Sequence, residues 1–149
     1  MASVNSYDDI PGGIGDIGTC NDNEIYVKTR IESLNDFIPA ATSLKQLVDL
    51  CNNYAKDCQV SIDQAKSSFE SGAYEDGKHD YVEDLSSMSE QYTNVIGDLD
   101  DLSAELENLL SELNADLTFC KDRKETWENA AAFLFKKQQE AEQAAMGGY

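Results

Sequence analysis

The segment that decides the fold is "LDDLSAELENLLSEL", residues 99–113. Its leucines recur at alternating steps of three and four, which places them on one face of an α-helix. The same spacing extends back to Leu85, so apolar side chains fill the a and d positions of four heptads. A repeat of this length predicts a long helix that packs against other helices. The residues of the repeat are Leu85, Met88, Tyr92, Val95, Leu99, Leu102, Leu106, Leu109 and Leu113.

The two flanks of this repeat differ in charge. With Leu85 at a, apolar residues such as Ile96 and Leu110 fall at e, whereas the g positions carry acids. A parallel pair of identical helices would set those acids against apolar residues, and an antiparallel pair would set acid against acid. We therefore expect the a, d and e positions to form one wide apolar face that is buried in a helical bundle. The neighbouring helices are expected to contain basic residues and to belong to the same chain or to a second subunit. The g acids are Asp84, Asp98, Glu105 and Glu112.

A first helix is predicted from residue 22 or 23 to residue 38, N-terminal to this repeat. We expect Pro39 to end it, because proline lacks a backbone donor and disfavours helical geometry in the residue before it. The residues that repeat at helical spacing are Val27, Ile31, Leu34 and Ile38.

A second helix is predicted to open at a capping box formed by Ser43 and Gln46. The glycine-bracketed residues 72–77 are expected to form the loop that ends it. Its predicted buried stripe is Leu44, Leu47, Cys51, Tyr54, Cys58, Ile62, Ala65 and Phe69.

The third helix is predicted to start near His79 or Asp80. Beyond Leu113 the a positions stay mostly apolar while the d positions fade, and no glycine or proline occurs from residue 98 to 146. This pattern favours one helix of nearly 70 residues, with a tight turn inside residues 117–124 as the alternative.

The expected fold is all-α: a bundle of three or four helices with one long coiled-coil-like helix and an extended N-terminal arm. Residues 1–21 are predicted to be a Gly-rich arm that Ile10, Ile14 and Ile17 anchor onto a neighbour. Residues 22–145 are predicted to form the helical domain, and residues 146–149 a short tail.

The chain is strongly acidic, with 29 acids, 11 basic residues and a net charge of −18. Such a field repels nucleic acid and anionic membranes, so neither is an expected partner. The N-terminus lacks the features of a signal peptide, and no run approaches the roughly 20 apolar residues of a membrane span. Four cysteines without an export signal indicate reduced thiols, in the cytoplasm or in a particle such as a virion assembled there.

The sequence offers little for catalysis. His79 is the only histidine and is expected to be an exposed residue at a helix start. Cys51 and Cys58 are seven residues apart, about 10.5 Å along a helix, too far to bind one zinc ion or to form a disulfide. No CxxC pair and no EF-hand spacing occurs. We therefore expect no enzymatic activity, cofactor or metal.

Two groups of residues are predicted to contact a protein partner. The first is acidic and lies in residues 79–120, which contain eleven acids and no lysine or arginine. The second is aromatic, since Phe133 and Phe135 cannot both share the face of Leu134. The candidates are Asp98, Asp101, Glu105, Glu112, Trp127, Phe133 and Phe135.

These features favour a non-enzymatic structural or assembly protein: an acidic helical subunit that oligomerises within a larger particle such as a virion, tail, appendage or cytoskeletal complex. The alternative is an acidic helical chaperone or inhibitor that masks a basic partner surface. In both cases the partner is protein, either a second copy or another chain.

Overall fold

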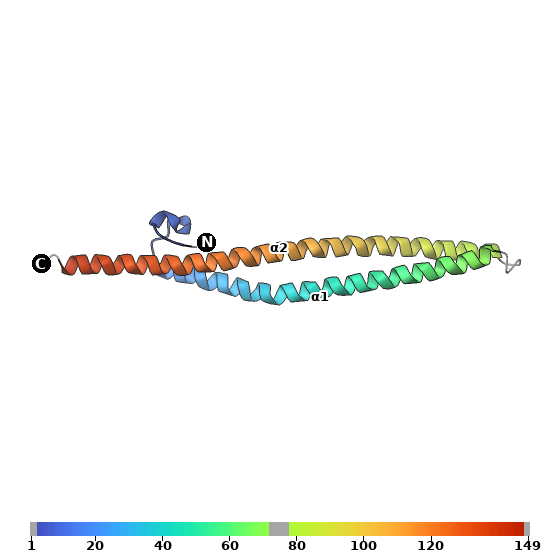
Figure 1. Ribbon diagram of the computed structural model, residues 1–149, viewed down its shortest axis with the longest axis horizontal. Helices are drawn as coiled ribbons and strands as arrows, with labels where there is room; N and C mark the ends of the chain where they lie inside the picture. Colours follow the sequence, from blue (N-terminus) through green and yellow to red (C-terminus); the bar gives the residue numbers. More distant parts are fainter. Residues whose placement is uncertain (1–2, 72–77, 148–149) are drawn as a thin grey trace. The chain divides into compact units, whose positions relative to one another are not determined.

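The computed structural model describes residues 3–71 and 78–147. Within them, two long helices, α1 (Ile17–Glu70) and α2 (Lys78–Met146), follow two short 3-10 turns, η1 (Tyr7–Asp9) and η2 (Pro11–Gly13) (Figure 1). This part of the chain contains no strand, so the all-α prediction is confirmed. The bundle of three or four helices is not confirmed, since the described residues form two. The loop predicted at residues 72–77 lies outside the described residues.

Helix α1 begins at Ile17, several residues before its predicted start. Asp16 explains the difference, because its Oδ2 atom accepts hydrogen bonds from the backbone N–H and from the hydroxyl of Thr19, both at 2.8 Å. This is the contact that an N-capping residue makes with the first helical turn. The same bonds to Thr19 hold the pKa of Asp16 below its ordinary value. The arm, in its described part, is therefore residues 3–16.

Helix α1 also runs through Pro39, so the predictions of a stop there and of a new start at Ser43 were wrong. A proline inside a helix leaves the carbonyl four residues earlier, here that of Asn35, without its usual donor, at a cost of roughly 3 kcal/mol. The helix continues because one heptad row carries on across the proline. Leu34 is buried before the proline, and Ala41 and Val48 follow at intervals of seven, partly and fully buried.

Helix α2 is a single helix of 69 residues, which confirms the prediction that one continuous helix extends beyond Leu113. It begins at Lys78, close to the predicted start. No turn occurs within residues 117–124. The apolar a row, which continues as Cys120, Trp127 and Leu134, stays buried over this stretch, so its packing against α1 offsets the fading d row.

The chain divides into two compact units. Unit 1 comprises Met1–Ile38 and Ser111–Tyr149, and unit 2 comprises Pro39–Leu110. In unit 2 the helices are antiparallel: hydrogen bonds join Asp49 to Ser103 and Asp63 to Ser89, so the numbers rise on α1 as they fall on α2. The acidic segment of α2 thus packs against the second helical segment of its own chain, as expected.

The buried stripe predicted for residues 44–58 of α1 was wrong. Leu44, Leu47 and Tyr54 keep 48%, 56% and 63% of their surface exposed. With Val48 and Ala55 assigned to heptad position a of α1, the side chains that face α2 belong instead to its a and e rows. Val48, Ala55 and the polar Asn52, which occupies e, are all buried. The apolar and the buried stripes coincide only from Ile62 onward, where Ile62, Ala65 and Phe69 are partly buried. Helix α1 is therefore rotated about its axis relative to the orientation that its apolar spacing predicts.

Candidate protein interaction surfaces

The arm of unit 1 folds back onto the helices. Ile10, at the junction of η1 and η2, is only 3% exposed and packs into a cluster with Cys20, Trp127 and Leu134. Tyr7 meets the Phe133 ring edge-on, with ring centroids 5.2 Å apart. Ile10 and Ile14 therefore pack the arm against its own chain, as expected. Two parts of the prediction were wrong: Ile17 belongs to α1, and the arm is not fully extended, because residues 7–13 form two 3-10 turns.

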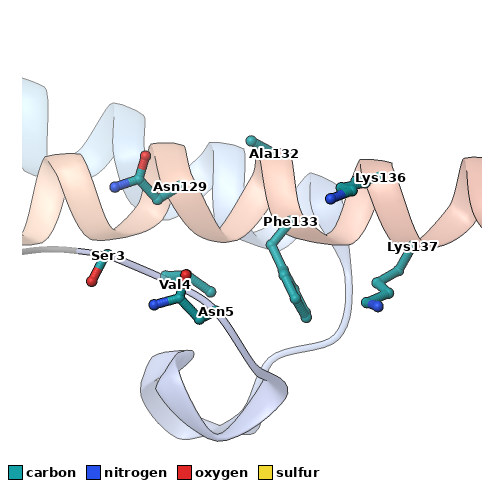
Figure 2. A pocket seen from close by; sticks show the side chains of 8 residues that line it. All are labelled: Ser3, Val4, Asn5, Asn129, Ala132, Phe133, Lys136 and Lys137. Atoms are coloured by element: carbon teal, nitrogen blue, oxygen red, sulfur yellow. The ribbon is translucent and has the colours of Figure 1, made fainter.

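The arm leaves a pocket of about 500 Å³ along α2 (Figure 2). Val4 and Asn5 lie on its arm side, and Phe133 projects from α2 toward the arm. The ammonium of Lys137 lies 5.6 Å from the centre of the Phe133 ring. Lys136 and Lys137 are the titratable residues that line this pocket, and no acidic residue, histidine or cysteine is among its lining residues.

The three aromatic interface candidates differ in exposure. Trp127 is 8% exposed within the core of unit 1, and Phe133 is partly buried beneath the arm. Phe135 remains 54% exposed. The aromatic surface that the sequence indicated is thus largely covered by residues of the same chain. From the sequence alone, burial of these aromatic residues by the same chain could not be distinguished from burial by a partner.

We expect Ile10→Asp to release the arm, because an ionised carboxylate cannot be buried without a partner. Trp127 is the only tryptophan of the chain, so its fluorescence reports the change directly. Its emission should move to longer wavelength and become easier to quench with iodide. Ile25→Asp is the matched control, since Ile25 is 60% exposed. Equal spectra for the two variants would show that the arm does not cover Trp127.

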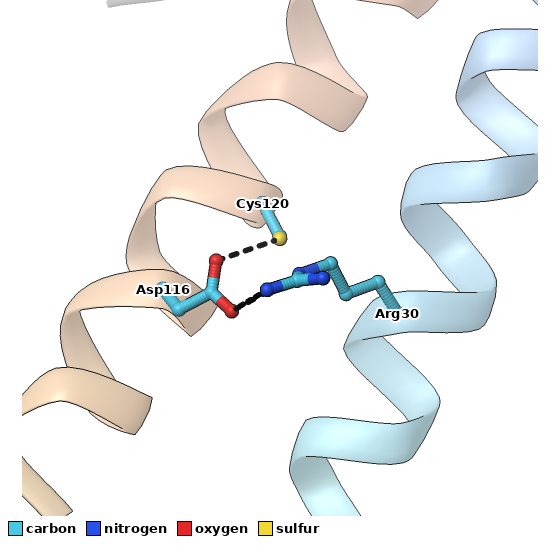
Figure 3. A network of polar contacts seen from close by, with 3 residues as sticks. All are labelled: Arg30, Asp116 and Cys120. Carbon is cyan, nitrogen blue, oxygen red and sulfur yellow. Dashed lines mark hydrogen bonds and ion pairs between the residues drawn. The ribbon is translucent and has the colours of Figure 1, made fainter. Parts of the chain in front are cut away.

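A polar network joins the two helices of unit 1 (Figure 3). Arg30 donates from Nε and Nη2 to Oδ2 of Asp116, with the Nε distance at 3.0 Å. The Cys120 thiol donates to Oδ1 of the same carboxylate at 3.6 Å. The hydrogen bond from Arg30 lowers the pKa of Asp116, and burial followed by the charge of Asp116 raises the pKa of Cys120. Sequence analysis did not predict this network, because Arg30 lies 86 residues from Asp116 in the chain.

The stability that Asp116 contributes should depend on pH. A carboxylate whose pKa is lowered on folding stabilises the fold above its unfolded pKa, here 3.8, and loses that contribution as the pH falls through the still lower folded value. We expect Asp116→Asn to reduce the melting temperature at neutral pH and to match the wild type in strong acid. Asp122→Asn, an exposed change on the same helix, is the matched control. Thermal melts across the acid range measure the difference.

In unit 2, one flank of the helix pair carries the polar contacts. The amide nitrogen of Gln59 donates to the Thr93 hydroxyl at 2.6 Å, and that of Asn52 donates to Asp100 at 2.5 Å. Lys56 forms an ion pair with Asp100 at 3.9 Å. These residues all occupy heptad positions b and e. When positions a and e of a helix face its neighbour, position b lies on one side of the contact and position d on the opposite side. The d residues of both helices therefore lie on the flank opposite these polar contacts.

That other flank is apolar, and no described residue of the chain covers it. We call it the uncovered face. On α2 the d row remains 41–47% exposed, although the heptad pattern predicted its burial. On α1 the thiols of Cys51 and Cys58 are exposed on the same flank. The residues of the uncovered face are Leu44, Leu47, Cys51, Tyr54 and Cys58 on α1 and Met88, Val95, Leu102 and Leu109 on α2.

The acidic candidates all lie exposed on α2. Asp98, Asp101 and Glu105 belong to unit 2, and Glu112 belongs to unit 1. None of the four has an ion-pair partner among residues 3–71 and 78–147. Asp98 and Glu105 occupy g positions, so they border the uncovered face.

Other candidate chemistry is sparse in the described part of the chain. His79 lies in the first turn of α2, where side chains are not described. Cys20 and Cys120 are buried, and burial raises the pKa of both thiols. Among the residues described, no three histidine, cysteine or acidic side chains come together as metal ligands. Neither described helix has a stretch long and apolar enough to cross a membrane.

No family model matches the sequence, and no curated protein or solved structure is significantly similar to the chain.

Proposed function

We propose that this chain is a non-enzymatic structural subunit that self-associates through its helices and serves the assembly of a larger particle, such as a virion, tail, appendage or cytoskeletal complex. The observation that supports this proposal is the uncovered face. Monomeric soluble proteins rarely expose contiguous apolar patches of more than a few hundred Å². A patch that repeats along two paired helices is typical of a surface that another helix pair covers.

The small apolar area that the two helices of unit 2 bury against each other supports the same proposal. A pair of antiparallel helices has no interior beyond one seam, and the seam of unit 2 contains small and polar residues on α1, such as Asn52, Ala55 and Gln59. Little apolar surface is therefore removed from water within unit 2 itself. Covering the uncovered face would add the burial that a stable fold needs.

Multi-angle light scattering against protein concentration tests self-association. We expect a mass that rises from that of one chain, 16.5 kDa, to at least twice that value. Added salt should strengthen association, because it screens the repulsion between chains of charge −18. A mass of one chain at every concentration and salt level would contradict the proposal.

The second candidate is an acidic chaperone or inhibitor that masks a basic partner. The observation that favours it is that four carboxylates have no ion-pair partner in the part of the chain that the structure describes: Asp98, Asp101, Glu105 and Glu112. A masking protein would remain a monomer or dimer in solution and would bind a basic partner more weakly as salt increases. Replacing the four acids by Asn or Gln should then slow binding to the partner, whereas in the assembly subunit it should strengthen self-association at low salt.

A further inference from the structure

We propose that the uncovered face of unit 2 binds the same face of a second copy, forming a four-helix bundle whose twofold axis runs parallel to the helices. In this arrangement α1 of one copy lies over α2 of the other. The inference rests on the proposed function, since it specifies the surface and the symmetry of that self-association.

The d rows of both helices lie on one side of the pair. Both helices are right-handed and they run in opposite directions. When a and e of each helix face the other helix, the d residues of both therefore lie on the same flank of the pair. Cross-helix polar contacts such as Asp49–Ser103 and Asp63–Ser89 occupy the opposite flank. On the d flank, a hydrogen bond joins the side chains of Tyr92 and Cys58. The helix pair therefore has one polar and one apolar side, and the apolar side extends along the length of unit 2.

The area of the face suits a dimer. Half of a large side chain is on the order of 80 Å², given that aromatic side chains bury about 150–250 Å². The seven large apolar residues of the face, each 41–63% exposed, together with two thiols, therefore offer on the order of 600 Å² per copy. A standard interface buries about 800 Å² per partner. The remainder would come from the polar rim.

Side-chain size along the face is complementary between the two helices. The antiparallel pairing sets Cys51 of α1 level with Leu102 of α2, and Cys58 level with Val95. Ala65 is likewise level with Met88, so a small residue on α1 accompanies a large one on α2 in these layers. When α1 lies over α2 of the second copy, small meets large in these three layers, which is how close-packed cores interdigitate. In the remaining layer Leu44 is level with Leu109, so two leucines meet there.

The rim of the face is complementary in the same arrangement. The g positions of α1 are uncharged, with Leu47 and Tyr54 followed by Ser61 and Ser68, whereas those of α2 are mostly acidic. The antiparallel pairing sets Tyr54 level with Asp98, so across the interface the phenol can donate to that carboxylate of the second copy. No acid faces an acid.

The other twofold arrangement has its axis perpendicular to the helices and sets α2 over α2 of the second copy. The large residues Val95 and Leu102 would then meet one another, and the small residues of α1 would leave space. Asp98 and Glu105 would also border the equivalent acids of the second copy, and facing like charges are destabilising. Both packing and charge favour the axis parallel to the helices.

Unit 1 shows the same heptad positions covered by the chain itself. The arm contacts α2 at Ala130 and Phe133, which occupy d and g. The arm ends in unit 1 and has no counterpart among the residues of unit 2. In the proposed dimer, a second copy covers the d and g positions of α2 in unit 2, as the arm covers them in unit 1.

The first experiment compares Val95→Asp with Val60→Asp by light scattering. Val95 occupies d in the uncovered face and is 47% exposed, and Val60 occupies f on the outer side of α1 and is 54% exposed. The residue type and the added charge are therefore matched. We expect Val95→Asp to weaken dimerisation at least tenfold and Val60→Asp to leave it unchanged. Far-ultraviolet circular dichroism checks that both variants remain helical.

Thiol reactivity gives a second, independent readout. Cys51 and Cys58 are exposed in the single chain, whereas Cys20 and Cys120 are buried. In a concentrated wild-type sample, Cys51 and Cys58 should react with a thiol reagent several-fold more slowly than in Val95→Asp at the same concentration. Equal rates in the two proteins would show that the face stays open.

Spin labels on α1 distinguish the two axes. Gln46, Asn53 and Ser67 are exposed and share heptad position f, so labels there lie equally far from the bundle axis. With Cys51→Ala and Cys58→Ala as the background, an axis parallel to the helices predicts one label-to-label distance at all three sites. A perpendicular axis predicts axial separations that change by about 3 Å per residue, twice the helical rise, and would overturn the proposed arrangement.

The outcomes separate this inference from the proposed function. A wild-type protein that remains a single chain overturns both. An oligomer that is equally sensitive or equally insensitive to Val95→Asp and Val60→Asp overturns the interface and leaves self-association in place.

Discussion

Replacing Trp127 by alanine is expected to lower the free energy of unfolding by about 3–5 kcal/mol, as for other large-to-small changes in a core. Trp127 is 8% exposed and lies in the cluster that joins the arm, α1 and α2 in unit 1. Its loss removes apolar burial and leaves a cavity that Ile10 and Cys20 would line. Urea titrations followed by circular dichroism measure the change.

The control for this variant is Phe135→Ala. Phe135 is 54% exposed, so its truncation should change the free energy of unfolding by less than about 1 kcal/mol. Trp127→Phe, which retains most of the apolar volume, should fall between the two. A loss at Phe135 as large as that at Trp127 would contradict the packing of unit 1.

Replacing Leu106 by alanine is expected to cost about 2–5 kcal/mol, and Leu102→Ala should cost clearly less in dilute solution. Both leucines belong to the heptad repeat from Leu85 to Leu113, but Leu106 is 7% exposed and Leu102 is 41% exposed. Leu106 faces α1 from an a position, whereas Leu102 belongs to the uncovered face.

The difference between the two leucine variants should shrink as the protein concentration rises. Association buries Leu102 in the proposed dimer, and a partner that binds only the folded chain stabilises it by mass action. Denaturation at a low and a high concentration gives the comparison. Equal losses at the lowest concentration would place both leucines in the seam of a single chain and would contradict the exposure of the d row.

Much of the helical content was predictable from local signals. The repeat from Leu85 to Leu113 and the absence of breakers beyond it indicated one long helix, and α2 is that helix. Sequence analysis placed the start of α1 too late because Asp16 lies among glycines, which indicated an arm. Aspartate is a preferred N-cap residue, and Asp16 accepts a hydrogen bond from the backbone N–H of Thr19 in the first turn of α1. Pro39 misled for a related reason: a local rule about one residue was outweighed by a row of apolar contacts on both sides of it.

The candidate surfaces were predictable only in part. The sequence identified the apolar rows and the acidic g positions that border the uncovered face, but it assigned the rows of α1 to the interior. It also identified Trp127 and Phe133 as residues that something covers, without indicating that the arm covers them. Contacts between segments about 120 residues apart leave no periodic trace in either segment.

By itself, the sequence determined that the chain is helical, that its long helix carries adjacent apolar rows at a, d and e, and that its charge is −18. The tertiary structure alone decided which two of those rows meet the neighbouring helix. Apolar spacing specifies the period of a helix but not its rotation about its own axis. In unit 2 the a and e rows face inward, which buries Val48, Ala55 and Leu106 and lets the amide nitrogens of Asn52 and Gln59 donate to Asp100 and Thr93 of α2. This rotation leaves Oδ1 of Asn52 buried without a hydrogen-bond partner among the described residues, which costs free energy. The row that faces inward therefore depends on the packing of the side chains of both helices together, and the apolar spacing of one helix does not contain that information.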